Sequence, residues 1–375
     1  GLISLPAAAA VFCCALTDFL TAVKDAGCFR VIASQRPKYV AEKLRGTARE
    51  GTEFYKYLLD DSELYTVKRA DFVDGFFDRT NRRPEGEDLF GFLIAIILVA
   101  GISLSGLQLY LGKTAYEAFT AFSKLAAFAM PLSAFFIINL PVITANIVAR
   151  KSGSALIGRA VGEEYADASV ISFADTEVYP ANRVKITSIK TYGDYRIDLI
   201  INDLAKVFSF VGGPLKQVTS NMLEGGADSS YTSARLIESA SDGICVVIDG
   251  REMFLGKKSY LRRYRFETPA DAKDDRFEEA GGSVMFVTMN DMLIAKVYVR
   301  YRISEQFNSL LRDMYRAGMC VGIKTVDPNI TTALLERTVR YKKCPISILK
   351  AGEVGDVEGH TDRIDSGIVS TASLH

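Results

Sequence analysis

Hydroxyl and carboxylate side chains directly follow two apolar runs that predict buried strands, and their residue types suit a ligand site. They are Asp175 and Thr176 after the run 168–173, and Thr325 and Asp327 at the end of the run 320–325. In an open α/β sheet, ligands bind where the carboxyl ends of the strands meet. The sequence therefore predicts a ligand site at this edge, while an ordinary turn explains residues 325–329 equally well.

The cysteine, histidine and charge content excludes several classes of site. The six cysteines are scattered without a Cys-x-x-Cys pair, and the two histidines are His360 and His375. This pattern argues against a zinc finger, a disulfide framework and a Cys–His nucleophile. Because 45 basic residues balance 45 acidic ones, we expect no nucleic-acid partner bound through a broad basic face.

Two long uncharged runs predict a transmembrane hairpin at 89–149. The first, Leu89–Gly112, has 24 residues, which at about 1.5 Å per residue cross a hydrocarbon core of roughly 30 Å. The second, Leu125–Ala149, contains two prolines, which in membranes mark locally unwound helix. The apolar run 1–23 is predicted as a further transmembrane helix. The lipid bilayer is therefore an expected partner.

The distribution of basic residues predicts the orientation of these spans. Residues 24–88 contain 13 Lys and Arg, whereas the link between the two uncharged runs contains only Lys113 and Lys124. By the positive-inside rule, 24–88 is a cytoplasmic connecting segment and the chain beyond 150 is also cytoplasmic. We expect an integral membrane protein with cytoplasmic soluble domains.

The region after residue 150 has the pattern of an α/β protein. It contains a predicted hairpin at 243–255 across Asp249-Gly250, a strand pair at 283–288 and 293–299, and a helix at 304–316. The stretch 191–282 lies between pieces of the α/β sheet and predicts an inserted antiparallel domain. This leaves 150–190 and 283–375 as the two parts of the domain that it interrupts.

The order of these parts resembles the P-type cation-transporting ATPases, most closely their heavy-metal branch, from about Phe90 to about Thr332. Four places carry the resemblance: the proline-broken span running into 165–173, then Gly213-Pro-Leu-Lys216, then Gly243-Ile-Cys-Val-Val-Ile-Asp-Gly250 with Gly256-Lys-Lys258, and then 318–329. The family's fold implies a membrane α-helical hairpin and a cytoplasmic α/β phosphorylation domain of the haloacid-dehalogenase-like Rossmannoid type. An antiparallel α+β nucleotide-binding-like domain is inserted into it.

The resemblance also implies an aspartate that accepts phosphate at the end of the first cytoplasmic strand. Ungapped alignment with the family's F-D-K-T-G puts Ala174 at this acceptor, Asp175 at the lysine and Glu177 at the glycine. We therefore predict that the acceptor carboxylate is lost. A one-residue slip would instead make Asp175 the nucleophile, with Thr176, Thr325 and Asp327 around it, and misalignment is a third possibility.

The family's cofactors are ATP and Mg²⁺, and the resemblance places Pro214, Gly243, Gly256 and Lys257 at nucleotide-site positions. Gly213 replaces the family's nucleotide-site histidine, and Lys257 replaces the usual glycine after the hairpin. These changes argue against adenine binding. The family's Mg²⁺ hinge motif has only a faint counterpart at 354–368.

No metal site is predicted in the membrane segments. Heavy-metal pumps bind soft ions through the thiolates of a Cys-Pro-Cys step, where this sequence has Met130-Pro131-Leu132. Met130 is expected to pack against neighbouring apolar side chains. Asn139 and Asn146 are expected to hydrogen-bond a neighbouring helix rather than an ion.

The changes at the acceptor, the nucleotide histidine and the thiolate step indicate a catalytically degenerate relative. We hypothesise a regulatory, scaffolding or nucleotide-sensing membrane protein that acts with another membrane protein. The alternative is an active cation pump or an aspartyl phosphatase that uses Asp175. A receptor domain on an unrelated membrane hairpin remains if the resemblance is chance.

Overall fold

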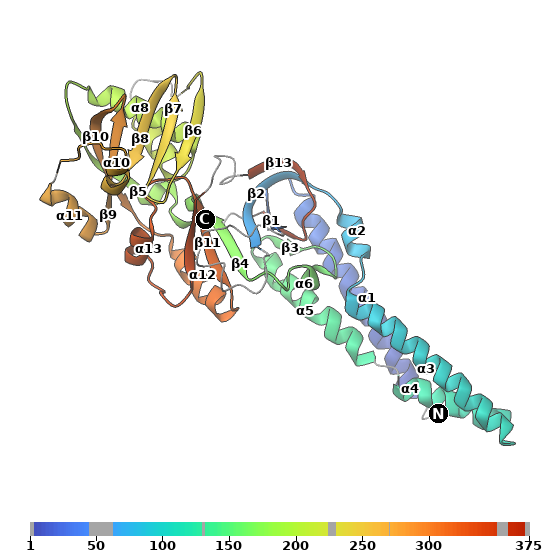
Figure 1. The fold of residues 1–375 in the computed structure, drawn as a ribbon. Coiled ribbons are helices and arrows are strands. Elements are labelled where there is room, and N and C mark those ends of the chain that lie inside the picture. The colour runs from blue at the N-terminus through green and yellow to red at the C-terminus, as the bar shows by residue number, and fades with distance from the viewer. Residues whose placement is uncertain are drawn as a thin grey trace. The chain divides into compact units, whose positions relative to one another are not determined.

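The computed structural model describes residues 4–44, 63–129, 132–223, 230–269, 271–350 and 359–371. The chain divides into two compact units, each made of separate segments (Figure 1). The first unit consists of Gly1–Val40, Ala70–Asp167 and Asp362–Ala372, and the second consists of Ala41–Arg69, Ala168–Thr361 and Ser373–His375. Met130 and Pro131, the predicted counterpart of the thiolate step, lie outside the described residues.

Long helices make up most of the first unit (Figure 1). They are α1 (Ser4–Ile32), α3 (Glu85–Tyr110), α4 (Ala115–Ala129) and α5 (Leu132–Lys151), with the shorter α2 (Phe76–Asn81) and α6 (Val161–Glu164). Helix α3 packs against α4, and α1 packs against α5. The close approach of α3 and α4 depends on Gly101, where a Cβ atom would lie 2.8 Å from the ring of Phe122.

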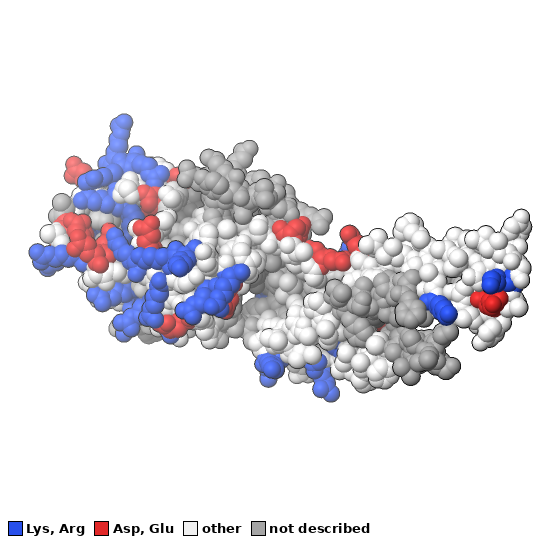
Figure 2. Space-filling model, turned by 90° about the horizontal axis from the view of Figure 1, so that it is seen from below, with Lys and Arg blue, Asp and Glu red and all other residues white. Residues whose placement is uncertain are grey.

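Helix α3 exposes large apolar side chains along its length, including Phe92, Ile96, Val99 and Ile102. Figure 2 shows few charged side chains over the helical part of the molecule, in contrast to the rest of that face. Within the described residues, Phe76–Tyr110 is the one stretch long and apolar enough to cross a membrane. The predicted spans at 1–23 and 125–149 therefore stay predictions.

The second predicted span is divided between two helices, because α4 ends at Ala129 and α5 begins at Leu132. Helix α4 itself begins ten residues before the uncharged run. Its start is fixed by a capping box: the Thr114 amide donates to Glu117 Oε2 at 3.0 Å, and the Glu117 amide donates to Thr114 Oγ1 at 3.3 Å. The Thr-x-x-Glu spacing is a sequence signal for a helix start, which the hydropathy pattern alone does not reveal.

The two asparagines near the second span hydrogen-bond protein groups. Asn139 Nδ2 donates to Glu87 Oε1 of α3 at 3.1 Å, which confirms the predicted contact with a neighbouring helix. Asn146 Nδ2 donates to the Leu156 carbonyl at 2.7 Å. Leu156 belongs to strand β3 (Ser154–Leu156), and the same Nδ2 donates to Cys28 Sγ of α1 at 3.0 Å, so the predicted contact of Asn146 with a neighbouring helix is also confirmed.

The second unit contains a parallel sheet in which strand β4 (Val170–Ala174) is central. Strand β11 (Cys320–Thr325) pairs with it on one side and with β12 (Ile346–Lys350) beyond, while residues 63–65 of β2 (Glu63–Val73) pair with it on the other. Helix α12 (Glu305–Arg316) leads into β11, and its Phe307 ring packs edge-on against Phe173. The predicted strands 168–173 and 320–325 and the helix 304–316 are confirmed.

A six-stranded antiparallel sheet forms the rest of the second unit. Its strand order is β5 (Val184–Thr191), β10 (Met292–Tyr301), β9 (Gly282–Met289), β8 (Arg251–Gly256), β7 (Gly243–Ile248) and β6 (Ala234–Ser239). Helix α8 (Ile197–Val211) shares a core with one face of this sheet, whereas α10 (Lys258–Arg263) packs on the other face. α9 (Pro214–Ser220) follows α8, and α11 (Ala272–Glu279) precedes β9.

Both predicted hairpins are present. Asp249 and Gly250 have φ angles of 52° and 77°, and Asn290 and Asp291 have φ angles of 47° and 64°. Two consecutive left-handed residues are the conformation of a type I′ turn, which matches the twist of antiparallel strands.

The antiparallel sheet extends beyond the predicted 191–282, because the second hairpin belongs to it. β10 pairs with both β9 and β5, so the antiparallel sheet runs from residue 184 to 301. The sequence pattern identified the hairpin at 283–299 but could not show which sheet it joins.

The predicted segments 150–190 and 283–375 are also divided differently. Residues 150–167 and 362–372 belong to the first unit, where β14 (Ile368–Ser370) pairs antiparallel with β3. The remaining described strands are β1 (Lys38–Leu44) and β13 (Gly359–Ile364).

Candidate functional site

Asp175 is the first residue after β4 and opens the short helix α7 (Asp175–Val178). Its side chain lies at the carboxyl edge of the parallel sheet and is fully buried. The prediction that this edge has lost its carboxylate is therefore wrong. Ala174 ends the strand, and the next residue supplies the acid, which is the position given by the one-residue slip.

Strand β11 brings Thr325 to this carboxylate. The parallel register pairs Ile323 with Phe173 and Lys324 with Ala174, so the next residues of the two strands meet at the edge. Thr325 Oγ1 donates to Asp175 Oδ2 at 2.6 Å. The structure thus joins two of the predicted site residues in one buried hydrogen bond.

Asp327 is hydrogen-bonded to Thr325 and extends this group of polar side chains. Its backbone N–H donates a hydrogen bond to Thr325 Oγ1 at 2.9 Å, and its Oδ1 accepts one from the Asn329 backbone N–H at 2.9 Å. Its Oδ2 accepts from the Tyr301 hydroxyl at 2.6 Å. Burial, together with the neighbouring Asp327 carboxylate, raises the pKa of Tyr301 well above its usual value, so Tyr301 is a permanent donor here.

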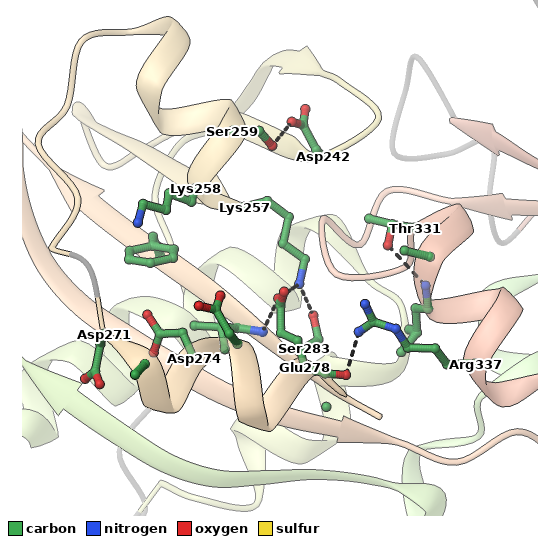
Figure 3. Close-up of a pocket in the computed structure, with 17 residues that line it drawn as sticks. Asp242, Lys257, Lys258, Ser259, Asp271, Asp274, Glu278, Ser283, Thr331 and Arg337 are labelled. Atoms are coloured by element: carbon green, nitrogen blue, oxygen red, sulfur yellow. Dashed lines mark hydrogen bonds and ion pairs between the residues drawn. The ribbon is translucent and has the colours of Figure 1, made fainter. Parts of the chain in front are cut away.

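A chain of hydrogen bonds runs from Asp327 to Lys257 at the edge of a cavity, and Figure 3 shows its last step, from Lys257 to Ser283. Asn329 Nδ2 donates to Asp327 Oδ1 at 3.1 Å, and Ser283 Oγ donates to Asn329 Oδ1 at 2.8 Å. Lys257 Nζ donates to Ser283 Oγ and to Glu278 Oε1, both at 2.7 Å. Burial lowers the pKa of Lys257, and the contact with Glu278 partly offsets this effect.

The cavity beside Lys257 has a volume of about 540 Å³ and carboxylates on much of its wall. In Figure 3, Asp271, Asp274 and Glu278 line one side, with Lys257 and Lys258 opposite them. These carboxylates already have cationic partners: Asp274 binds the buried Lys296 at 2.6 Å, and Glu278 binds Lys257.

The other residues predicted at the nucleotide site serve packing. A Cβ atom on Gly243 would collide with the ring of Tyr260, and one on Gly256 would lie 2.6 Å from the Asp242 carbonyl. Pro214 is buried at the first position of α9. The preceding Gly213 covers Asp175, since a Cβ atom there would lie 3.2 Å from Asp175 Oδ2.

Thr176 is separated from this buried group. It lines a second cavity of about 930 Å³, together with Arg183, Gly213, Lys216 and Ser304. Of the predicted catalytic residues, Asp175, Thr325 and Asp327 therefore lie together, whereas Thr176 lines a different cavity.

Known proteins resemble the chain in structure but not detectably in sequence. No protein-family model matches it, and no curated protein matches it. A zinc-transporting PIB-type ATPase in the E2.Pi state is similar at 16% identity and a TM-score of 0.36, over 68% of this chain and 41% of that one. The catalytic domain of a CPx-ATPase, CopB-B, is similar at 13% identity and a TM-score of 0.33, over 54% of this chain and 69% of that one.

The chain resembles the heavy-metal branch of the P-type ATPases. The N-domain of a copper-transporting P-type ATPase is also similar, at 11% identity and a TM-score of 0.24, over 32% of this chain and 99% of that domain. This chain spans about two fifths of the length of the zinc-transporting ATPase that it matches.

As arranged, the Asp327 carboxylate is engaged by protein groups. Both carboxylate oxygens of Asp327 accept hydrogen bonds from protein groups, and no group of three potential metal ligands occurs within the described part of the chain. The ring of Tyr260 occupies the space beside Gly243.

Sequence analysis missed Tyr301, Ser283 and Glu278. Tyr301 and Ser283 lie on strands of the antiparallel sheet, and each meets the Asp327 group only through the tertiary fold. No spacing in the sequence connects them with 325–329.

The Thr325 hydroxyl is expected to stabilise the edge of the sheet. Thr325→Val removes the donor to Asp175 and the acceptor for the Asp327 amide, so it should lower the free energy of unfolding by about 1–3 kcal/mol. Urea unfolding of the purified chain measures this change.

Thr288→Val is the matched control. Thr288 is equally buried, but its hydroxyl has no hydrogen-bond partner among the described residues. Removing an unsatisfied buried hydroxyl is expected to leave stability unchanged or to raise it. Equal losses in the two variants would contradict a specific role for Thr325.

Proposed function

We propose that this chain is a P-type-ATPase-like membrane protein that forms no aspartyl phosphate and acts as a regulatory or scaffolding partner of another membrane protein. The observation that carries the proposal is the complete burial of Asp175, with Thr325 bonded to its Oδ2 and Gly213 above it. An acceptor carboxylate must be reached by the γ-phosphorus of ATP, which this arrangement prevents.

The residues around Asp175 support the same proposal. The next residue is Thr176, where the family's acceptor is followed by a lysine that neutralises phosphate charge. Glu177, two residues beyond Asp175, is half-buried and adds negative charge where phosphate would have to approach. In the proposed role, Asp175, Thr325 and Asp327 hold the domain together, and Lys257, Gly243, Gly256 and Pro214 shape it.

In this proposal the apolar helices of the first unit span a lipid bilayer, and the second unit is cytoplasmic. The exposed apolar surface of α3 and the candidate span Phe76–Tyr110 support the bilayer as a partner. The hydrogen-bonded state of Asn139 and Asn146 supports a helical region without a bound metal ion.

The second candidate function is an active cation pump or aspartyl phosphatase that uses Asp175, ATP and Mg²⁺. It is favoured by the position of Asp175 at the carboxyl edge of the sheet, next to the Thr325 hydroxyl. This function requires an opening movement that exposes Asp175.

Acid-quenched labelling separates the two functions. The purified full chain is incubated with γ-labelled ATP and Mg²⁺, quenched with acid and treated with hydroxylamine. We expect no hydroxylamine-sensitive label in the unmodified protein. A label that disappears in Asp175→Asn would establish the active alternative, whereas stabilisation by ATP without any label would identify a nucleotide sensor.

A further inference from the structure

The cavity that contains Thr176 is distinct from the buried Asp175 group. Its volume is about 930 Å³, which is within the range of small-molecule sites in proteins. It lies between the residues after α7, the start of α9 and the start of α12, all in the second unit. Asp175 is not among the residues that line it.

The start of α12 opens into this cavity without a cap. Ser304 is the N-cap residue, yet its side chain makes no capping hydrogen bond. Its hydroxyl has no partner among the described residues, although Ser304 is only 6% exposed and lines the cavity. The first amides of an α-helix also lack acceptors within the helix. The hydroxyl of this largely buried serine and the unpaired amides therefore offer donors to whatever occupies the cavity.

Among the residues that line the cavity, two are basic and one is acidic. Arg183 and Lys216 line it, and within the described residues neither has a carboxylate partner at ion-pair distance. Glu305 lines it as well, but its carboxylate binds Arg340 at 3.0 Å. Arg183 Nη1 donates to the Ile303 carbonyl at 3.4 Å. Two cations without a carboxylate partner, together with the positive end of a helix dipole, favour a bound anion.

We propose that this cavity binds a phosphate group, either as orthophosphate or as the phosphate of a small phosphomonoester. Ser304, the first amides of α12 and the Thr176 hydroxyl supply hydrogen-bond donors, while Arg183 and Lys216 supply the charge. This inference goes beyond the proposed function, because it needs neither phosphorylation of Asp175 nor ATP.

The test is calorimetric titration of the purified full chain in detergent with sodium orthophosphate, ribose 5-phosphate and AMP, against sodium chloride at matched ionic strength. We expect saturable binding of orthophosphate or ribose 5-phosphate, and none of chloride. Arg183→Gln with Lys216→Gln should weaken binding at least tenfold, and Ser304→Ala should weaken it less. The tenfold factor corresponds to about 1.4 kcal/mol.

Lys343→Gln is the matched charge control, since Lys343 is exposed and lies outside the cavity. It should bind like the unmodified protein. The proposal is overturned if none of the three phosphate probes binds, or if the Arg183/Lys216 double variant binds as tightly as the control. Because no ATP is present, such a failure leaves the acid-quench result untouched.

Discussion

Replacing Asp274 with alanine is expected to lower the free energy of unfolding by about 3 kcal/mol or more. Lys296 is fully buried, and its Nζ lies 2.6 Å from Asp274 Oδ2. The same carboxylate accepts from the Tyr298 hydroxyl at 2.7 Å. Removing one partner of a buried ion pair leaves an uncompensated charge, which costs about 3–5 kcal/mol. Asp271 remains at 3.9 Å from Lys296 Nζ and partly compensates the charge of the ammonium. The expected loss is therefore at the lower end of this range.

Asp275→Ala is the control for this prediction. Asp275 is the next residue on α11 and is exposed, so its removal should change the free energy of unfolding by no more than about 0.5 kcal/mol. Urea unfolding in detergent, followed by tyrosine fluorescence, measures both variants.

A double variant tests the cause of the loss. If the buried ammonium causes it, then Asp274→Ala combined with Lys296→Met should recover most of the stability, because Lys296→Met removes the uncompensated charge and keeps most of the side-chain volume. A double variant that is less stable than Asp274→Ala alone would show that Lys296 stabilises the sheet by other contacts.

The parts of the fold that the sequence predicts well are those that local chemistry determines. The Asp249-Gly250 and Asn290-Asp291 turns adopt the left-handed conformation that their residue types favour. Helix α12 follows its apolar periodicity. The sheet to which the second hairpin belongs depends on β10 pairing with β5, about a hundred residues earlier in the chain, and no local pattern encodes this choice.

At the candidate site, too, local patterns predict part of the arrangement and long-range packing determines the rest. Residue types and strand ends predict that Asp175, Thr325 and Asp327 gather at one edge, and the β4–β11 register confirms it. Motif alignment left Ala174 and Asp175 as alternative acceptor positions, since it compared letters and not the position where the strand ends. The roles of Tyr301 and Ser283 could not be predicted, because they reach Asp327 and Asn329 only when the antiparallel sheet packs against the parallel one.

A steep loss of stability is expected above about pH 10, because three tyrosines are buried with their hydroxyls bonded to protein groups. Tyr179 and Tyr260 are fully buried and Tyr301 is 3% exposed. Their hydroxyls bond Thr338, Glu238 and Asp327 respectively. Burial raises the pKa of all three above the usual value.

The direction of the pH effect follows from these raised pKa values. Above about pH 10 the unfolded chain releases tyrosine protons that the folded chain retains, so stability is complete below this pH and falls as the pH rises toward the folded-state pKa values. Each tyrosine contributes about 1.4 kcal/mol per pH unit, and the three together about 4 kcal/mol per pH unit. Urea unfolding at a series of alkaline pH values measures this slope.

Tyr179→Phe separates this cause from general alkaline damage. It removes one group whose pKa is raised by burial, so the slope should fall by about 1.4 kcal/mol per pH unit. Tyr315→Phe is the control, because Tyr315 is 47% exposed and its ionisation should be nearly the same in the folded and unfolded chains. A slope that both substitutions leave unchanged would mean that other groups cause the alkaline loss of stability. The fully buried Tyr179 would then have to ionise within the folded protein.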